Sequence, residues 1–155
     1  MPRPIEIVPA TPGMLPQLSA LLGLLFAQES DFAPDPAAQL RGLEMIIDAP
    51  AFGRILVAKQ GDEVLGMVGL LFTLSTALGA KVAMLEDMVV TPAARGEGIG
   101  GRLLEAAVAL AEREGCRRVT LLTDGDNLSA QRFYASHGFN ASAMRPWRRL
   151  LGDQG

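Results

Sequence analysis

Apolar residues recur with the spacing of a helix in several stretches of the chain. Near the N-terminus, Met14, Leu18, Leu21 and Leu25 fall on one face of such a helix. It would begin at Thr11-Pro12, with Thr11 as the N-cap and proline in the first turn. The predicted helices span residues 12–28, about 36–48, about 98–114 and 129–136.

Short apolar runs, bounded by turn residues, predict strands. They span residues 5–9, 54–59, 64–73, 82–90 and 118–123, with a last strand beginning at Phe139. The order β-α-α-β-β-β-α-β-α-β contains first a hairpin and then a strand–helix–strand crossover. It predicts an α/β fold, a mixed sheet with helices on both faces. We expect a single domain over residues 1–155, with its core at about 4–145.

Composition and charge exclude some classes of partner. The chain has 155 residues and a formal net charge of -3, without a block of Lys and Arg that would bind nucleic acid. The apolar run at residues 21–27 is too short to cross a bilayer. We therefore expect a cytoplasmic protein with neither a nucleic-acid nor a membrane partner.

Cys116 and His137 are the single residues of their types. One thiol cannot form an internal disulfide, and one Cys with one His cannot form a zinc site alone. His137 lies where a helix ends, which favours a surface residue over a general base. No metal is expected.

Four glycines lie at the start of the helix predicted at about 98–114. Gly96, Gly98, Gly100 and Gly101 allow the backbone to turn sharply and to approach a ligand. The first amides of a helix have no partner inside it and point outward at the positive end of its dipole. Such a site suits a phosphate or pyrophosphate. The alternative is a tight loop that only starts the helix.

Gly96, Gly98 and Gly101 also match the G-x-G-x-x-G pattern of a dinucleotide fold, and Asp124 ends the next strand, where a ribose-binding acid is expected. Two facts argue against this fold. Residues 91–95 separate the glycines from the preceding strand, and the 54 positions after Gly101 are too few for a second mononucleotide half. A P-loop is excluded because neither Lys-Ser nor Lys-Thr follows the glycines.

Residues 90–104, Val-Thr-Pro-Ala-Ala-Arg-Gly-Glu-Gly-Ile-Gly-Gly-Arg-Leu-Leu, resemble the acetyl-coenzyme A loop of the GNAT N-acetyltransferase superfamily. The family pattern is Arg or Gln, two residues, Gly, one residue, Gly or Ala, and Arg95, Gly98 and Gly100 match it. A second family element, N-x-x-A-x-x-F-Y-x-x-x-G-F, matches residues 127–139. Two motifs at this separation are more specific than either alone, and the order of elements agrees with the family.

The resemblance implies a mostly antiparallel sheet in which the parallel strands at 82–90 and 118–123 splay apart. The pantetheine arm of acetyl-CoA would pair with the first of them, and an amide near Val89 would polarise the acetyl carbonyl. Backbone amides at residues 98–102 would hold the pyrophosphate, with Arg95 beside it. The implied cofactor-binding residues are Met88, Val89, Val90, Arg95, Gly96, Glu97, Gly98, Ile99, Gly100, Gly101, Arg102, Asn127, Ala130 and Phe133.

The reaction needs a proton acceptor, because a primary amine with a pKa of ~10.4 is mostly protonated at neutral pH. Glu86 and Asp87 lie in the strand at 82–90, and neighbours on a strand point to opposite faces, so only one of them should face the acceptor. Residues 85–90 resemble the L-E-D-L-x-V segment of family members that acetylate small amines, which implies Glu86 as base or substrate-binding residue. The alternative is that both acids only bind backbone amides or an arginine.

The leaving thiolate, with a reference pKa of ~8.5, can be protonated by a tyrosine, whose pKa is ~10. Tyr134 is the single tyrosine and matches the family's general-acid position. Its alternative role is packing with Phe133. Asn127 would bond the pantetheine arm or instead cap the short helix, and one Asn could serve only one of these well.

These features together predict an N-acetyltransferase that moves an acetyl group from acetyl-CoA to an amine of a small molecule or a peptide. Glu29, Asp31 and Asp35, between the first two helices, are either acceptor contacts by family analogy or solvated charges. The resemblance also allows a homodimer. The competing functions are a coenzyme A-binding sensor or partner domain without chemistry and, less favoured, a nicotinamide oxidoreductase.

Overall fold

Five strands form one sheet in the order β1-β2-β3-β4-β5. In the computed structural model, which describes residues 3–28 and 33–152, neighbouring strands are antiparallel except for the parallel pair β4 and β5. This confirms the predicted mixed sheet with one parallel pair. The strands are β1 (Ile5–Pro9), β2 (Gly53–Gln60), β3 (Glu63–Ser75), β4 (Ala80–Val90) and β5 (Val119–Leu121).

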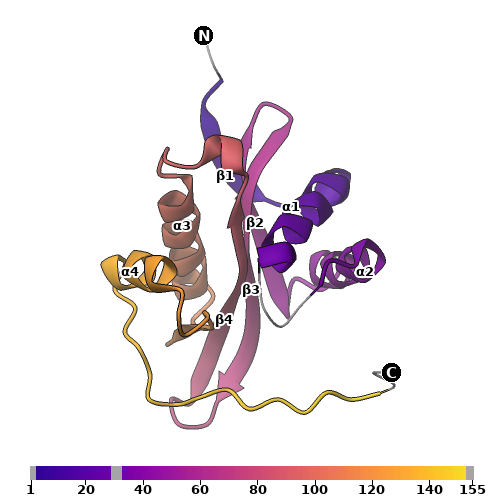
Figure 1. Cartoon of the computed structure of the whole chain (residues 1–155). Coiled ribbons are helices and arrows are strands. Elements are labelled where there is room, and N and C mark those ends of the chain that lie inside the picture. Colours follow the sequence, from indigo (N-terminus) through magenta and orange to yellow (C-terminus); the bar gives the residue numbers. More distant parts are fainter. Residues whose placement is uncertain (1–2, 29–32, 153–155) are drawn as a thin grey trace. The chain divides into compact units, whose positions relative to one another are not determined.

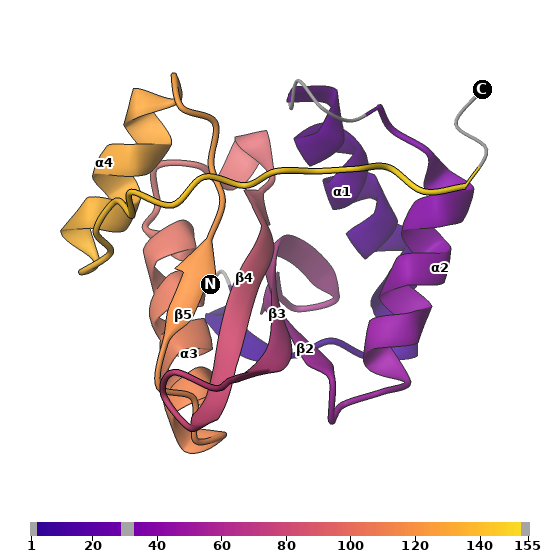
Figure 2. The same ribbon diagram turned by 90° about the horizontal axis from the view of Figure 1, so that it is seen from below.

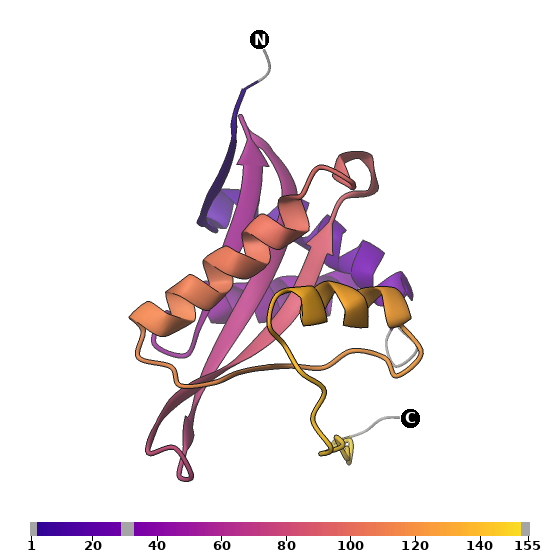
Figure 3. The same ribbon diagram turned by 90° about the vertical axis from the view of Figure 1, so that its left-hand side faces the viewer.

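The chain divides into two compact units, Met1–Asp124 and Gly125–Gly155, and each is described by itself. The first holds the sheet with α1 (Leu15–Gln28), α2 (Pro36–Ile47) and α3 (Ile99–Arg113), and the short turns η1 (Pro12–Met14) and η2 (Pro92–Ala94). Figure 1 shows α1 and α2 on one side of the sheet and α3 on the other. In Figure 3, α3 crosses in front of the strands while α1 and α2 lie behind them. The expectation of helices on both faces is confirmed.

Each face of the sheet has its own apolar core. Beneath α1 and α2, the buried leucines Leu18, Leu22 and Leu43 pack with Ile55 of β2 and Val89 of β4. On the opposite face, α3 contributes the fully buried side chains of Ile99, Leu103 and Leu104. Their spacing is that of one helix face, which is why the apolar pattern predicted this helix.

A buried glutamine joins α1 to α2. The Gln39 side-chain amide donates hydrogen bonds to the backbone oxygen and the hydroxyl of Ser19, at 2.9 and 3.3 Å, and its Oε1 accepts from the Asp35 amide at 2.8 Å. Asp35 caps α2, because its Oδ1 accepts a hydrogen bond from the Ala38 amide. These bonds satisfy the polar atoms of a buried side chain and fix the spacing of the two helices.

The N-terminal cap was predicted wrongly. Pro12–Met14 form a 3-10 turn, α1 starts at Leu15, and the Thr11 side chain makes no cap hydrogen bond. Proline has no amide hydrogen and fixes its own φ, so Pro12 favours the tight turn, which ends where Pro16 occupies the first turn of α1. No helix among the described residues is long and apolar enough to span a membrane.

The second unit contains one helix among its described residues, α4 (Leu128–Ser136), with caps at both ends. The predicted last strand from Phe139 is not formed, because the described residues after α4 carry no helix or strand. Phe139 instead turns back onto its own helix. Its amide donates to the Tyr134 carbonyl at 3.1 Å, and its ring lies 5.9 Å from the Tyr134 ring.

Candidate active site

An open strand edge lies at the centre of the first unit. The parallel pairing of β4 with β5 ends at Leu85 and Leu121, whereas β4 continues to Val90. Among the described residues, no strand pairs with residues 86–90 on that side, and Figure 2 shows β5 alongside β4 in the sheet. β5 is shorter than the predicted 118–123. An unpaired edge of this kind can accept an extended ligand as an additional strand.

On its other edge, the same part of β4 is paired to β3. Val89 lies opposite Met67, and Val90 lies opposite Gly66. The Val89 side chain is buried in the core beneath α1 and α2, so the backbone at this position is firmly placed. Met88 next to it is half-buried. The three predicted pantetheine-binding residues, Met88, Val89 and Val90, therefore lie together on the open segment.

The glycine loop follows β4 through η2 and leads into α3. Gly98 is the N-cap of α3 and has φ +77°, a left-handed conformation that costs any other residue strain. A Cβ built at Gly98 or at Gly96 would meet no other atom within 4 Å, so the loop presents open space in front of the helix. The first backbone bond of α3 runs from the Arg102 amide to the Gly98 carbonyl at 3.2 Å. The amides of Ile99, Gly100 and Gly101 precede that bond and lie at the positive end of the helix dipole, as an anion site requires.

Two arginines next to the loop contact backbone oxygens. The Arg102 guanidinium donates to the Ile5 carbonyl of β1 at 2.9 Å and so ties α3 to the edge of the sheet. Arg95 Nε donates to the Val90 carbonyl at 3.3 Å, which holds its exposed side chain against the end of β4. Glu97 is exposed. Arg95 is thus placed beside the loop, whereas the amide and side chain of Arg102 both have partners within the protein.

A β-bulge interrupts β4 at its two acids. The pairing with β3 shifts between Met67 and Gly69, so that Asp87 and Met88 lie opposite Val68. Asp87 has φ 55°, which makes it the one residue other than glycine with positive φ among the described residues. Aspartate tolerates this conformation better than most residues.

The bulge places both acids on the same face of the sheet. Gly69 pairs with Ile55 on one side and with Glu86 on the other, and directly paired residues point to the same face. Ile55 packs beneath α1 and α2, so the exposed Glu86 side chain also leaves the sheet on that face. Asp87 lines a cavity there. The expectation that only one acid could face this side fails, because the bulge breaks the alternation of the strand.

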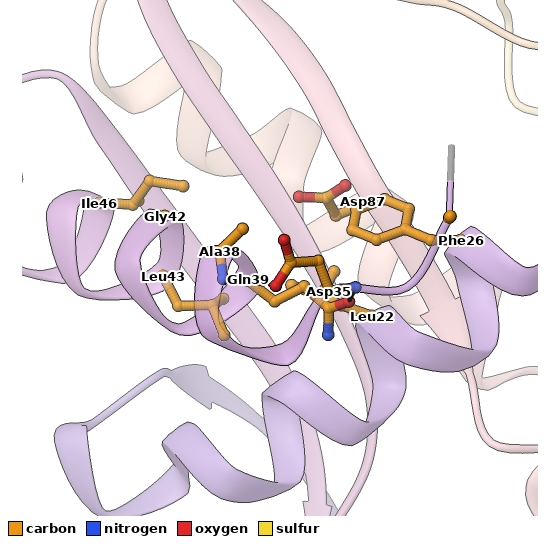
Figure 4. Close-up of a pocket in the computed structure, with 10 residues that line it drawn as sticks. Leu22, Phe26, Asp35, Ala38, Gln39, Gly42, Leu43, Ile46 and Asp87 are labelled. Atoms are coloured by element: carbon orange, nitrogen blue, oxygen red, sulfur yellow. Dashed lines mark hydrogen bonds between the residues drawn. The ribbon is translucent and has the colours of Figure 1, made fainter. Parts of the chain in front are cut away.

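A cavity of about 300 Å³ lies between α1, α2 and β4. Its walls are mainly apolar, from Leu22 and Phe26 of α1 and from Leu43 and Ile46 of α2. Figure 4 shows the Asp87 carboxylate pointing into it from the side of the sheet, across from Asp35 at the start of α2. Asp35 is thus both the cap of α2 and a lining residue, while Glu29 and Asp31 lie outside the described residues.

In the second unit, the residues of the predicted N-x-x-A-x-x-F-Y-x-x-x-G-F element build α4. Asn127 Oδ1 accepts a hydrogen bond from the Ala130 amide at 3.1 Å, so the structure shows the helix-capping alternative for Asn127. Gly138 has φ +89°, which suits the residue after a helix end. The pattern thus has a local structural reason, because it specifies both ends of one short helix.

Tyr134 lies within a group of rings on α4. Its ring centroid is 5.2 Å from that of Phe133, and the His137 ring packs on Phe133 at 5.0 Å. Burial raises the pKa of the Tyr134 phenol above its usual value, because the charged phenolate loses solvation. The phenol is therefore protonated at neutral pH, which a general acid requires.

Comparison with known proteins identifies the fold. Residues 20–139 match the model of the Acetyltransferase (GNAT) family. The chain belongs to this family. It is 33% identical over 124 residues to the uncharacterised N-acetyltransferase YhfO of Bacillus subtilis (strain 168), over 78% of this chain and 83% of that protein. As a GNAT acetyltransferase, it is an acyl-CoA-dependent N-acetyltransferase, and the family uses acetyl-CoA as cosubstrate.

A second curated protein and a solved structure that are similar to this GNAT chain carry different functional descriptions. The aminoalkylphosphonate N-acetyltransferase of Salmonella typhimurium (strain LT2) is 30% identical over 89 residues, covering 57% of this chain and 58% of that protein. A crystal structure from Bacillus halodurans C-125, described as a transcriptional regulator, has a TM-score of 0.81 at 29% identity and covers 95% of this chain and 100% of that one. The chain is thus similar in fold to a protein whose description is not that of an acetyltransferase.

The apolar cavity and the bulge at Asp87 were not predicted from the sequence. A bulge is a property of strand pairing, and the one local sign of it is a residue type that tolerates positive φ. The cavity is formed by helices far apart in the chain from β4, so no local motif marks it.

Proposed function

We propose that this GNAT chain transfers the acetyl group of acetyl-CoA to a primary amine by direct attack. The observation that carries the proposal is the open edge of β4 at residues 86–90, which begins at the two acids, Glu86 and Asp87, and is followed by the glycine loop. A cosubstrate on this edge would have its pyrophosphate near the loop and its acetyl end near the acids.

The reaction consists of one bond formed and one broken. Acetyl-CoA supplies a thioester whose carbonyl carbon is attacked by the amine nitrogen, so that a C–N bond forms while the C–S bond breaks and a thiolate leaves. The protein must take one proton from the amine and provide one to the sulfur.

Each step has a candidate residue in this chain. Glu86 takes the amine proton, directly or through water, and its exposed position on the acceptor face supports this role. The backbone amide near Val89 polarises the carbonyl. Tyr134 protonates the thiolate, and the raised pKa of its phenol keeps the proton available.

For the cofactor, the amides that begin α3 hold the pyrophosphate, with Arg95 beside them. The left-handed Gly98 and the open space at Gly96 support this proposal. The pantetheine arm pairs with Met88, Val89 and Val90. Asn127 belongs to this set on sequence grounds, although its Oδ1 caps α4 in this structure.

The decisive experiment measures thiol release from acetyl-CoA in the presence of polyamines, amino acids, aminoglycosides and peptide N-termini. We expect release that depends on at least one amine and an acetamide product with the mass of that amine plus an acetyl group. Binding of acetyl-CoA without release for any amine would instead support a coenzyme A-binding domain without chemistry.

A further inference from the structure

The cavity between α1, α2 and β4 has walls suited to an apolar group. Leu22 and Leu43 are almost fully buried, and Phe26 and Ile46 pack beside them. A volume of about 300 Å³ is at the small end of ligand sites, which measure roughly 300–1,000 Å³. An apolar body entering this space would replace water against hydrocarbon, which is favourable in proportion to the area covered.

The charges on the cavity have a single sign. Asp35 and Asp87 line it, and none of the described lining residues is Lys, Arg or His. A negative charge on a ligand would therefore meet carboxylates and no cation, whereas an ammonium group would be attracted.

The backbone at Asp87 is the third observation. A residue other than glycine at φ 55° costs free energy, and such strain persists at sites where the surrounding structure requires it. The bulge at this position brings the Asp87 carboxylate to the same face as Glu86, whereas in an unbroken strand the two side chains would point to opposite faces.

From these observations we infer that the acceptor is a primary amine with a compact apolar body and no anionic group, whose ammonium is held by Asp87. The inference rests on the proposed amine transfer and adds the class of amine. Asp87 binds and positions the acceptor, while Glu86 takes its proton. The inference also separates this chain from its relative named for aminoalkylphosphonates, whose acceptor name includes an anionic group.

The first test compares three amines that share the phenethylamine unit: phenethylamine itself, phenylalaninamide and phenylalanine, of which the last two add a carboxamide and a carboxylate on the carbon that bears the amine. The amide is a neutral match for the carboxylate, so the comparison isolates the charge. We expect kcat/KM for both neutral-bodied amines to exceed that for phenylalanine by about tenfold or more, the effect of one added repulsion near a carboxylate. Equal values, or a preference for phenylalanine or for 2-aminoethylphosphonate, would overturn the inference and leave the proposed transfer intact.

The second test removes the charge at Asp87. Asp87→Asn should raise KM for phenethylamine and reduce its preference over phenylalanine, because the carboxylate nearest the ammonium is lost while Asp35 remains. Asparagine tolerates the same backbone conformation, so the fold should be kept. Glu86→Gln is the matched variant on the same face. It should lower kcat and keep the preference, and loss of the preference in Glu86→Gln but not in Asp87→Asn would contradict the assignment.

The third test fills the cavity. Gly42 of α2 lines it, and a Cβ there would meet no atom within 4 Å beyond its chain neighbours and its own helix backbone, so a side chain can begin at this position without a clash and Gly42→Leu should occupy part of the space. Gly23 of α1 has equally open surroundings but does not line the cavity, so Gly23→Leu is the control. We expect Gly42→Leu to lower kcat/KM for phenethylamine by about tenfold or more while acetyl-CoA affinity stays unchanged.

Calorimetric titration of phenethylamine and phenylalanine into the protein measures acceptor binding without acetyl transfer. It therefore tests the inference independently of the proposed reaction. Selective binding of phenethylamine, lost in Gly42→Leu and retained in Gly23→Leu, would support the cavity even if no amine were acetylated. Binding of neither amine to the protein with coenzyme A present would overturn it.

Discussion

The two proposed binding regions, one for acetyl-CoA and one for the acceptor, are built from different parts of the chain. The proposed acetyl-CoA region consists of backbone groups. They are the left-handed Gly98, the first amides of α3 and the open edge of β4. The proposed acceptor region, beneath α1 and α2, consists of side chains. Large apolar side chains and two carboxylates line its cavity.

This difference explains why the cofactor region could be predicted from the sequence and the acceptor region could not. Amides and positive φ angles depend on glycines at fixed positions, so a cosubstrate common to the family leaves a readable pattern. An acceptor is selected by shape and charge, which residues from separate elements provide together. Substitutions at Tyr134 and Gly98 test these assignments.

The largest effect is expected at Tyr134, the proposed general acid. Tyr134→Phe should lower kcat by about 100-fold, the low end for loss of general acid catalysis, because a thiolate already leaves readily. The affinity for acetyl-CoA and the acceptor KM should remain unchanged, since the ring can still pack with Phe133 and Phe139. Pre-steady-state thiol release would measure the chemical step, and an unchanged rate would remove the general-acid assignment.

A smaller effect is expected from the backbone of the glycine loop. Gly98→Ala puts a Cβ on a left-handed residue, at a cost of about 1–2 kcal/mol, which corresponds to roughly 5- to 30-fold weaker acetyl-CoA binding if the loop relaxes. Gly115→Ala, with φ +85° at the other end of α3, has the same strain away from the loop. Calorimetry should show weaker binding in the first variant only, with similar losses of stability in both.

The smallest effect concerns the pH dependence of stability that the half-buried Tyr134 phenol contributes. Because burial raises the pKa of Tyr134, its contribution to stability is fully present below the unfolded pKa of ~10 and is lost as the pH rises through the folded pKa. The free energy of unfolding should therefore fall above pH 10 in the wild-type protein and fall less in Tyr134→Phe. Urea unfolding at pH 9 and pH 11 measures this free energy. An equal change between the two pH values in both proteins would contradict a raised pKa of the phenol.

Much of the fold could be predicted from the sequence, because it depends on local patterns. The helix α3 follows from its apolar face and α4 from Asn127 and Gly138 at its ends. The last strand was wrongly predicted at Phe139, since an apolar residue after a helix end can equally turn back on that helix.

The acceptor side was less accessible to sequence reasoning. Glu86 and Asp87 were recognised as a pair, but their orientation depended on the register between β3 and β4. A shift of one residue changes which face a side chain occupies, and this shift is set by the pairing of the whole strand. The same holds for the cavity, whose walls come from both helices.

The left-handed backbone at Asp87 limits which residues this position can accept. Glycine, asparagine and aspartate adopt such a conformation readily, whereas lysine, arginine and glutamate do so at a cost. Substitution of Asp87 by asparagine or glycine thus removes the negative charge with little backbone strain, whereas substitution by lysine or arginine, which would reverse the charge, adds strain. A change of acceptor toward anionic amines would have to introduce its cation elsewhere on the cavity wall, for instance on α2.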